Sequence, residues 1–383
     1  MALPIERQGS HTAGRGEDVA LLGSCLAYET YLGRAYQGDS RLLLQSNEIR
    51  PESVDLLMMS PPFALTRQKD YGNETASRYV EWFSSFVQPF LRVLKPTGSM
   101  VIDIGGAFLP GRPQRSTYHF QLVVELAKHF DLCQEFYWYN PAKLPSPAEW
   151  VNVRRVRVKD SVNPVYWFAR DAANTKADNR RVLRRYSESM EALLKNGYQY
   201  RVRPSGHDIS HKFTRRHDGA IPPNLLGPSH DTDEIPTELV GDEFESLFPN
   251  LLAISNTSSN ARYQRACAAH GIKPHPARFP LGLPAFFIEF LTEMGDVVCD
   301  PFAGSNVSGE AAESLGRKWI SCDIDDEGGT YVRASAFRFP NAKLSREFDY
   351  SPEGNYHVTS RQAAGEMTGA PAGRAAGTQI NQS

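Results

Sequence analysis

The chain has 383 residues, of which 41% are hydrophobic and 22% charged, an ordinary composition for a globular protein. Its length allows one large domain with an insertion, or two domains. It has no run of 18 apolar residues that would predict a membrane span, no secretory signal at its amino terminus, and five scattered cysteines without a CxxC pair. With a net charge of −2, these features predict a cytoplasmic protein with no membrane partner, no disulfides and no metal site.

Between residues 21 and 171 the chain alternates strand and helix patterns. A buried strand at 53–59 precedes an amphipathic helix at 77–95, and further strands are expected at 99–106, 132–139 and 163–170, with a helix at 118–130. This alternation predicts an α/β fold with a doubly wound, mostly parallel sheet and helices on both faces.

The middle of the chain, residues 172–270, breaks this rhythm. Paired arginines, many turn residues and little periodicity predict an insertion of loops and short helices on a rigid scaffold. The rhythm resumes in residues 271–350, with helices at 283–294 and 305–316 and strands at 296–300 and 318–325. Residues 1–20 and 351–383, rich in Gly, Ala and polar residues, are predicted to be disordered tails.

Charge is segregated along the chain although its total is near zero. Residues 151–220 contain 16 Lys and Arg against 7 Asp and Glu, whereas residues 221–260 contain 7 acidic residues and no basic one. Such a basic block is typical of a face that binds a polyanion, but it can equally be a solvated face paired with the acidic segment. Charge alone leaves both interpretations open.

The sequence SPPF at residues 60–63 follows directly after the buried strand at 53–59. Proline donates no hydrogen bond to a sheet and fixes φ at about −65°, so two consecutive prolines make a stiff loop. In open α/β sheets, ligands bind at the carboxyl ends of the strands. The loop is therefore predicted to present the Ser60 hydroxyl, a backbone carbonyl and the Phe63 ring to a ligand.

A second motif, DPFAGSN at residues 300–306, lies between a predicted strand and a predicted helix. Gly304 permits close backbone approach, and Ser305 or Asn306 can cap the helix that follows. The next strand ends in Asp323, and a carboxylate at this place in a nucleotide-binding unit accepts ribose hydroxyls. One glycine is too few for the pyrophosphate fingerprint, so the expected ligand is a nucleoside without a diphosphate.

Together, SPPF and a separate DPFAGSN resemble the catalytic and cofactor motifs of the DNA amino-methyltransferases. The segments QGDS at 37–40, LKPTGSMVIDI at 94–104 and KPHPARFP at 273–280 also occur where this family places similar ones. The catalytic motif comes about 240 residues before the cofactor motif, an order that resembles the beta group of the family. The resemblance implies a Rossmann-like methyltransferase sheet with an inserted target-recognition region at 172–270, S-adenosyl-L-methionine as cofactor and double-stranded DNA as substrate.

The residue before the two prolines bears on the target base. Family members with Ser there usually methylate N4 of cytosine, and those with Asp usually methylate N6 of adenine. The resemblance implies a site-specific cytosine-N4 methyltransferase of the restriction–modification type, which flips its base and methylates it by direct attack, with a cognate restriction endonuclease as a possible partner. Cytosine C5 chemistry is excluded, because it needs a cysteine after a proline and none of the five follows one.

The resemblance also assigns roles to residues. The Ser60 hydroxyl and the Pro61 carbonyl, held by the stiff Pro61-Pro62 pair, would accept hydrogen bonds from the target amine while Phe63 stacks on the base. The residues assigned to the cofactor are Asp300, Pro301, Phe302, Gly304, Ser305, Asn306, Asp323, Asp39 and His275, with Asp325 as a rival to Asp323. A turn role for Asp39 and a capping or packing role for His275 stay open.

The basic block supplies the residues expected to contact DNA. These are Arg154, Arg155, Arg157, Lys159, Arg180 and Arg181. For the last two, a solvated helix is the competing interpretation.

Three alternatives remain at this point. An N6-adenine methyltransferase on the same fold is the nearest, because the choice between Ser and Asp is a tendency within the family. A non-catalytic DNA-binding specificity subunit is the second, although the intact motifs argue against it. An RNA methyltransferase is the third, since charge does not distinguish the two nucleic acids.

Overall fold

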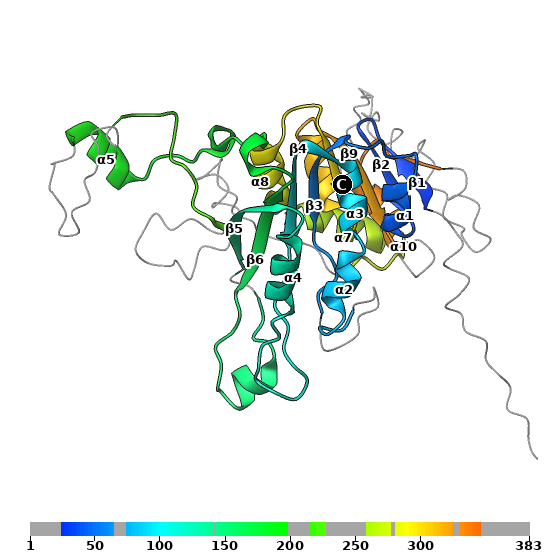
Figure 1. The fold of residues 1–383 in the computed structure, drawn as a ribbon, viewed down its shortest axis with the longest axis horizontal. Coiled ribbons are helices and arrows are strands. Elements are labelled where there is room, and N and C mark those ends of the chain that lie inside the picture. Colours follow the sequence, from blue (N-terminus) through cyan, green and yellow to red (C-terminus); the bar gives the residue numbers. More distant parts are fainter. Residues whose placement is uncertain are drawn as a thin grey trace, which may run out of the picture.

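The computed structural model describes residues 24–64, 74–140, 143–197, 215–226, 258–276, 280–324 and 330–345 of the chain. Within these residues a ten-stranded sheet runs in the order β10-β1-β2-β9-β8-β3-β4-β6-β5-β7 (Figure 1). The strands are β1 (Cys25–Glu29), β2 (Gly33–Gln37), β3 (Val54–Met59), β4 (Leu94–Asp103), β5 (Asp131–Tyr139), β6 (Val162–Ala169), β7 (Leu225–Leu226), β8 (Val297–Asp300), β9 (Lys318–Asp323) and β10 (Lys343–Leu344).

The middle of the sheet is parallel and its ends are mixed. Strands β2, β9, β8, β3 and β4 follow one another in parallel pairs. β1 pairs antiparallel with β2 and β10, and β6 pairs antiparallel with β4 and β5. The α/β class and the mostly parallel sheet are confirmed. β6 runs antiparallel to β5, and in the described part of the connection between them, residues 143–161, only the short turn η2 (Glu149–Val153) is helical.

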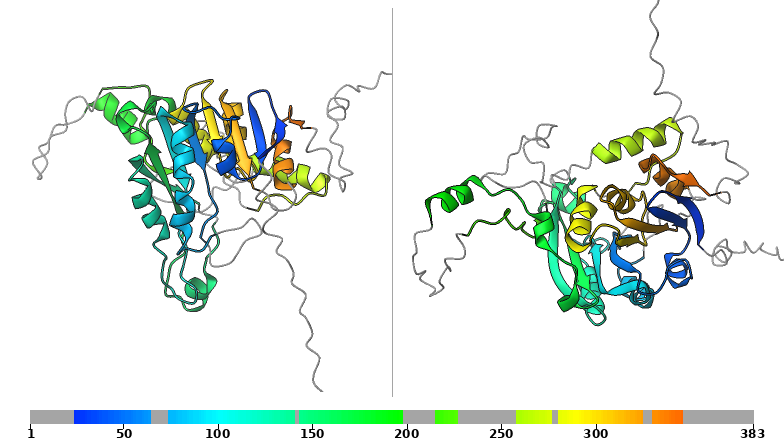
Figure 2. Two further views of the ribbon diagram at one scale, coloured as in Figure 1. Left: turned by 45° about the vertical axis from the view of Figure 1, so that its right-hand side comes forward. Right: turned by 90° about the horizontal axis from the view of Figure 1, so that it is seen from above.

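Helices cover both faces of the sheet (Figure 2). They are α1 (Ser40–Gln45), α2 (Tyr79–Ser84), α3 (Val87–Val93), α4 (Tyr118–Leu126), α5 (Glu188–Asn196), α7 (Ser258–Ala269), α8 (Gly282–Leu291), α9 (Val307–Ser314) and α10 (Thr330–Ser335), with shorter helical turns η2 (Glu149–Val153), η3 (Ala172–Asn174), η4 (Asn179–Val182) and η6 (Ala336–Arg338). On β3, Leu57 and Met59 belong to the core that α1 to α4 cover, whereas Leu56 and Met58 belong to the core that α8 and α9 cover. Burial of every residue of β3 follows from this double cover.

The helix predicted at 77–95 is broken into two short helices, α2 and α3. Strand β4 also starts earlier than predicted, at Leu94. Residues 95–98, which contain Pro96 and Gly98, bulge out of register with β3. A proline that cannot donate to the ladder is tolerated in such a bulge, so Pro96 shapes the strand instead of a loop before it.

The described parts of residues 172–270, the predicted insert, contact the scaffold. The Lys176 ammonium group donates to the carboxylates of Asp55 and Asp296, at the amino ends of β3 and β8. β7 extends the sheet beside β5, and α7 packs against α10 and η6. Only α5 projects away from the sheet among the helices of this region that the structure describes (Figures 1 and 2).

Parts of the predicted insert and both predicted tails lie where the structure describes nothing. Residues 198–214 and 227–257 of the predicted insert, Asp325, and the predicted tails at 1–20 and 351–383 lie outside the described residues. Within the described ranges, no helix has the length and apolar character needed to cross a membrane.

Candidate active site at the carboxyl edge of the sheet

The two sequence motifs meet at one edge of the sheet. β3 and β8 are neighbours, with Leu56 paired to Val298 and Leu57 paired to Cys299. From β3 the chain goes to β4 on one side, and from β8 it goes to β9 on the other, so the two strands form the topological switch point of the sheet. Ligands of open α/β sheets bind outside the carboxyl ends of the strands at such a point. SPPF leaves β3 there, and DPFAGSN leaves β8 beside it.

The catalytic loop is anchored to β4 by its first and last residues. The Ser60 hydroxyl donates a hydrogen bond to Oδ2 of Asp103, at 3.2 Å. The Phe63 ring lies against the backbone of Gly105, where a Cβ would stand 2.5 Å from the ring. Pro61 is buried and Pro62 is half-buried. A side chain at position 105 would therefore displace the ring that was predicted to stack on the base.

Asp103, the last residue of β4, is the main residue that the sequence reasoning missed. It is only 2% exposed, and burial raises the pKa of its carboxyl to about 7, although the Ser60 hydrogen bond and the charge of Lys143 lower it. Among the described residues, its Oδ1 makes no hydrogen bond of ordinary length, although the nearby Asn163 side chain also lowers the pKa. The signal was present in the sequence, because an acidic residue ended a buried strand just before Gly105 and Gly106.

Lys143 stands behind this carboxylate at the base of the connection from β5 to β6. Its ammonium group donates to Oδ1 of Asn163, at 2.8 Å, and burial lowers its pKa. A partly buried cation near a buried carboxylate favours the ionised form of the carboxylate.

Asp300 holds the DPFAGSN loop, called the cofactor loop for the role proposed below, through two hydrogen bonds. Its Oδ1 accepts from the backbone N–H of Phe302, at 3.0 Å, and its Oδ2 accepts from the Ser308 hydroxyl, at 2.6 Å. Burial raises the pKa of Asp300 to about 7, and these two bonds act in the opposite direction. Asp300 thus joins the loop to α9, and Pro301 beside it is also buried.

At Gly304, the His275 ring packs closely against the backbone of the loop. The φ of Gly304 is +51°, and a Cβ there would stand 2.9 Å from the imidazole ring of His275. Its N–H donates to Oδ2 of Asp323, at 2.6 Å. The structure therefore places His275 and Asp323 beside the loop; their predicted contact with a cofactor stays a prediction. His275 is buried, its N–H donates to the Tyr263 hydroxyl, and its ring packs on Tyr331.

Of the two residues that could cap α9, Asn306 does so. It has a left-handed φ of +58°, and its Oδ1 accepts from the N–H of Gly309, at 3.1 Å. Ser305 instead binds Arg338, whose guanidinium group donates to both the carbonyl and the hydroxyl of Ser305. The Arg338 side chain is fully buried and also pairs with Glu310, at 2.6 Å. Its role was not predicted, because its contacts come from elements distant in sequence.

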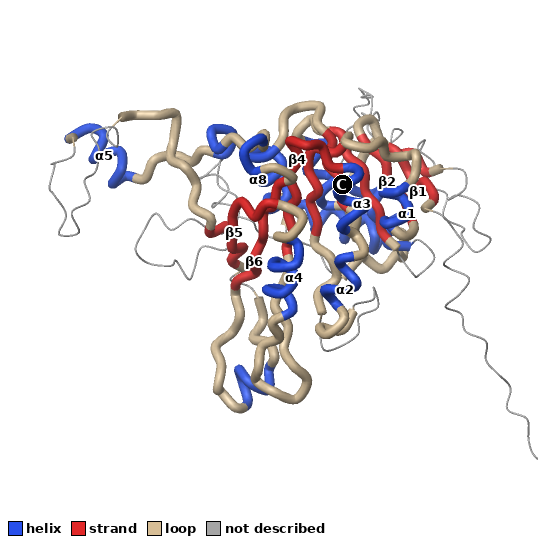
Figure 3. Tube along the Cα trace, viewed as in Figure 1, coloured by secondary structure: helices blue, strands red, loops and turns tan. Residues whose placement is uncertain are grey.

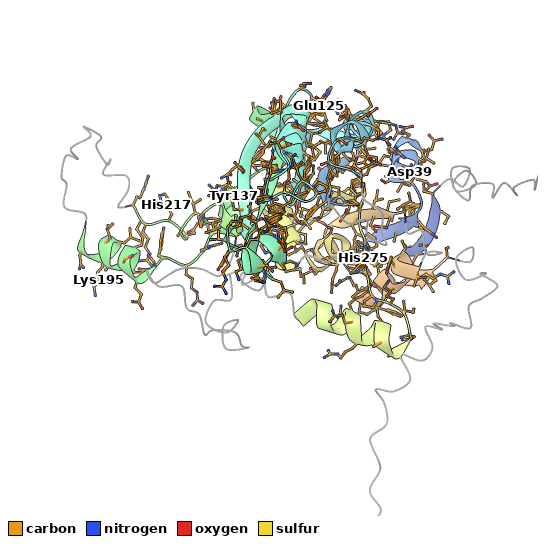
Figure 4. The ribbon with its side chains drawn as sticks, turned by 90° about the horizontal axis from the view of Figure 1, so that it is seen from below. Asp39, Glu125, Tyr137, Lys195, His217 and His275 are labelled. Atoms are coloured by element: carbon orange, nitrogen blue, oxygen red, sulfur yellow. The ribbon has the colours of Figure 1, made fainter. Side chains whose placement is uncertain are left out.

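Phe302, in the loop, and Asp39, beside it, make further contacts. The Phe302 ring packs against Trp82 of α2 and Phe86, the N-cap residue of α3. Asp39 caps α1, and the preceding Gly38 donates its N–H to the backbone carbonyl of Asp323, at 2.9 Å. Burial would raise the pKa of Asp39, but hydrogen bonds from Arg41 outweigh burial and lower it. Asp39 and His275 lie on the same side of the molecule (Figure 4).

The six basic residues predicted to contact DNA do not share one surface. Arg154, Arg155, Arg157 and Lys159 lie in the connection from β5 to β6, which leaves the same edge of the sheet as the catalytic loop. Arg180 and Arg181 lie in η4, just after Lys176, which binds the amino ends of β3 and β8 at the opposite edge.

Arg180 and Arg181 are also engaged within the protein. The Arg181 guanidinium group donates to the carbonyls of Lys176, Phe290 and Thr292, and Arg180 pairs with Asp178, at 2.6 Å. This placement does not favour phosphate contact by either arginine.

Comparisons with known proteins agree with this geometry. The family model described as DNA methylase, for N6 and N4 amino-methyltransferases, matches residues 54–333. The chain belongs to this DNA methylase family.

Individual proteins are also similar to the methylase over most of its length. It is 45% identical over 335 residues to the Type II methyltransferase M.PvuII of Proteus hauseri, covering 86% of this chain and 90% of that one. Among solved structures, PvuII DNA methyltransferase (cytosine-N4-specific) superposes with a TM-score of 0.61 and 42% identity, covering 83% of this chain and 89% of that one. The Type II methyltransferase M.BamHI of Bacillus amyloliquefaciens is 22% identical over 309 residues, covering 78% of this chain and 56% of that one.

Proposed function

We propose that this methylase transfers a methyl group from S-adenosylmethionine to the exocyclic N4 of cytosine at specific sites in duplex DNA. The observation that carries this proposal is the position of Ser60 at the switch point, with its hydroxyl bound to Asp103 and the DPFAGSN loop beside it. The similarity to a relative whose structure is titled cytosine-N4-specific supports the choice of base.

The loop after β8 suits a nucleoside cofactor. The Asp323 carboxyl stands at the end of β9, next to the Gly304 backbone and to the turn that carries Asp39. A carboxylate in this position accepts ribose hydroxyls. We assign Asp323, Gly304 and Asp39 to hold the cofactor, while Asp300, Pro301, Phe302, Ser305, Asn306 and His275 keep the loop in shape. When bound, S-adenosylmethionine supplies a methyl group made electrophilic by its sulfonium.

Ser60 and Pro61 activate the target amine. The Ser60 hydroxyl already donates its hydrogen to Asp103, so the lone pairs of its oxygen are left to accept from the amine. The Pro61 carbonyl is the second acceptor. When both N–H groups are bound, the nitrogen lone pair is drawn out of conjugation with the ring and becomes nucleophilic. Fixed acceptors of this kind lower the barrier through preorganisation, with no covalent step on the enzyme.

Asp103 completes the proton path, which sequence alone left open. Once the N–CH₃ bond has formed, the nitrogen carries one proton too many. We propose that this proton passes to the Ser60 oxygen while the Ser60 hydroxyl proton passes to Oδ2 of Asp103, so Ser60 ends unchanged and Asp103 ends neutral. A carboxyl whose pKa burial raises to about 7 is a far better proton acceptor than an exposed aspartate.

Phe63 supports the flipped base. Because its ring is held against Gly105 on one side, only the other part of the half-buried ring is left for stacking. Base–aromatic stacking is worth about 1–3 kcal/mol.

We further propose that residues 172–270 form the target-recognition region. The described part farthest from the sheet consists of α5 and residues 215–220, and it carries Lys195 and His217 (Figure 4). There Arg216 pairs with Glu191, at 2.9 Å, and its guanidinium group lies over the ring of Tyr186. This arrangement offers donors and an aromatic face away from the core, which suits contact with a second macromolecule.

The test of the function is direct. The protein is incubated with unmethylated bacterial duplex DNA and S-adenosylmethionine, the DNA is digested, and methylated nucleosides are identified by mass and retention time. N4-methylcytosine is the expected product, and retention separates it from 5-methylcytosine. N6-methyladenine would overturn the choice of base, and a product found only with RNA would overturn the substrate. Sequencing of the methylated DNA then gives the recognition site.

A cognate restriction endonuclease is the partner we propose, because the relatives above are named Type II methyltransferases. Plasmid DNA from cells that express the methylase should resist an endonuclease that cuts the mapped site, and the Ser60→Ala variant should give no protection.

A further inference from the structure

Two connections leave the carboxyl edge of the sheet beside the catalytic loop and project together (Figures 1 and 3). One is residues 105–117, between β4 and α4, and the other is residues 143–161, between β5 and β6. We call these two segments together the arm. Its turn η2 lies at the end farthest from the sheet.

Side-chain contacts make the arm one unit. The Arg157 guanidinium group lies 4.5 Å above the centre of the Phe108 ring and donates to the carbonyl of Pro113, at 3.0 Å. Arg115 pairs with Asp160, at 2.9 Å. Each of these contacts joins one segment of the arm to the other. The two segments therefore form one folded unit.

The tip of the arm is also ordered by its own backbone. The N–H of Val156 donates to the carbonyl of Trp150, at 3.0 Å, and the N–H of Arg154 donates to the carbonyl of Glu149, at 2.8 Å. Between them, Arg155 has a φ of +54°, which is uncommon for a residue with a side chain. Such a conformation costs free energy and is found where the surrounding structure or a function requires it.

Apolar side chains are exposed on this tip. Val153 is 69% exposed, Val156 61% and Val158 86%, and Leu144 near the base of the arm is 78% exposed. A single exposed valine needs no explanation, but a group of them on a projecting, ordered segment marks an interaction site.

The charge around these valines identifies the partner. The arm contains seven Lys and Arg residues against two Asp and Glu residues. Arg154 and Arg155 lie between Val153 and Val156, and Lys159 follows Val158. Alternating apolar and basic residues fit a nucleic acid, which offers phosphates on the outside and apolar base faces inside. A purely apolar protein partner would not select the basic residues.

The base of the arm is part of the active site. Asp103, which binds Ser60, directly precedes the first segment, and Lys143 begins the second. The N–H of Ile104 donates to the carbonyl of Pro164, which holds the two segments together where they leave the sheet. A duplex that delivers a base to Ser60 must therefore pass beside the arm.

Base flipping leaves a gap in the duplex. The extruded base gives up its stacking and its pairing, at a cost of about a few kcal/mol. Proteins that bend or open DNA commonly insert an apolar side chain between bases to offset that loss. An apolar side chain suits such a gap when it is exposed in the free protein, held by an ordered segment and flanked by phosphate-binding cations.

We propose that the tip segment Val153–Val156 enters the duplex next to the target and that its valines fill the space the flipped base leaves, while Arg155 binds an adjoining phosphate. Arg154 pairs with Glu149, at 2.9 Å, and so helps to hold the tip in shape. The inference rests on the proposed DNA methyltransferase function and adds a residue-level role that the catalytic and cofactor motifs do not contain.

The experiment compares two duplexes that carry the mapped site. In one the target cytosine is paired with guanine, and in the other it is mismatched with adenine and so is already unpaired. Single-turnover methylation is measured with wild-type protein, with Val153→Ser/Val156→Ser and with Val153→Leu/Val156→Leu. Val124→Ser, at an exposed valine of α4, is the control, and thermal unfolding checks that each variant folds.

The serine double variant should be about tenfold slower on the matched duplex and within about threefold of wild type on the mismatched one, because the mismatch has already removed the pairing that the wedge offsets. The leucine variant and Val124→Ser should stay within about threefold of wild type on both duplexes. Equal losses on the two duplexes, or no loss on either, would overturn the wedge while leaving the methyltransferase function intact. Wild-type protein that methylates neither duplex would overturn the proposed function itself.

Discussion

The cofactor loop and the catalytic loop leave neighbouring strands, but they are stabilised very differently. In the cofactor loop, Asp300, Gly304, Ser305 and Asn306 each bind another part of the scaffold. At the catalytic loop, the Ser60 hydroxyl donates to Asp103, and the second oxygen of that buried carboxyl makes no hydrogen bond of ordinary length among the described residues.

The difference follows from what each loop receives. The cofactor is the same molecule in every turnover, so its loop can be closed by the protein's own groups before binding. The target base arrives from a duplex and must find hydrogen-bond acceptors that the protein has not already filled. An unfilled acceptor in a buried place costs stability, and such costs are concentrated at functional sites.

The strongest test of a prebuilt cofactor loop is Arg338→Met. This change leaves Glu310 without its buried cation and removes two hydrogen bonds to Ser305, so the free energy of unfolding should fall by about 3–5 kcal/mol. Chemical denaturation measures it, and cofactor affinity should fall as well. Arg262→Met is the matched control, since Arg262 also binds Glu310 but is exposed, and its loss should cost less than about 1 kcal/mol. Equal losses of unfolding free energy in the two variants would contradict a cofactor loop that buried Arg338 holds in place before binding.

Ser60→Ala tests the open catalytic loop. It should bind S-adenosylmethionine as wild type does and lower kcat by about 10²–10³-fold, the usual effect of removing one preorganised group. Isothermal titration gives the affinity, and a methyl-transfer assay gives kcat. Turnover within a few-fold of wild type would show that the hydroxyl has no part in activating the amine.

The pH dependence of the rate tests the proton path. Burial raises the pKa of Asp103 to about 7, so only above that pH is the carboxylate fully able to accept a proton, and kcat should rise through pH about 7. Asp103→Asn should be slow and should lose this dependence. Asp300→Asn is the control, because burial also raises the pKa of Asp300 to about 7, yet at saturating cofactor the rise should persist.

Asp103→Asn should slow the reaction but raise the stability of the protein at high pH. The folded-state pKa of Asp103 lies above the unfolded value of about 3.9, so the contribution of this group to stability is present below pH 4 and is lost as the pH rises to about 7. Asp103→Asn should therefore be more stable than wild type at pH 8, by up to about 4 kcal/mol, and show little gain at pH 4. Urea unfolding at the two pH values measures the difference. A loss of stability at pH 8 would contradict it.

Phe63→Ala should weaken capture of the flipped base by roughly 1–3 kcal/mol, seen as a higher KM for DNA with unchanged cofactor affinity. Gly105→Ala should act in the same direction, because its Cβ would stand 2.5 Å from the ring and displace it. If Gly105→Ala acts by displacing the Phe63 ring, the double variant should lose no more affinity for DNA than Phe63→Ala alone. Additive effects would separate Gly105 from stacking.

The smallest expected effect separates the two groups of arginines. Replacing Arg155 in the arm by alanine should reduce the slope of log K against log salt by about 0.9, the value for one phosphate contact. Arg180→Ala, at the opposite edge of the sheet, should leave the slope unchanged. A change of slope for Arg180 would restore it as a DNA contact.

The local parts of this protein could be read from its sequence. The strand before SPPF, the strand and helix around DPFAGSN, and the carboxylate at Asp323 all depend on residues close together in the chain, where hydrophobic period, proline and glycine act directly. The likeness of the motifs to one family also predicted which two loops belong together, and the adjacent strands β3 and β8 confirm it.

Other parts depended on the order of the strands. Asp103 meets Ser60 only because β4 lies beside β3. Arg338 reaches Ser305 from η6, 33 residues later in the chain, and Arg181 donates to the carbonyls of Phe290 in α8 and of its C-cap residue Thr292. A basic run in the sequence does not reveal which edge of the sheet it occupies, so Arg155 and Arg180 read alike although they lie on opposite sides.

The sequence by itself thus determined the motifs, the class of fold and the chemistry, since these follow from residues within a few positions of one another. The tertiary structure decided which acid binds Ser60, which edge of the sheet each group of arginines occupies and which valines are exposed on the arm. Such pairings are set by the packing of strands far apart in the chain, and local patterns carry no information about that packing.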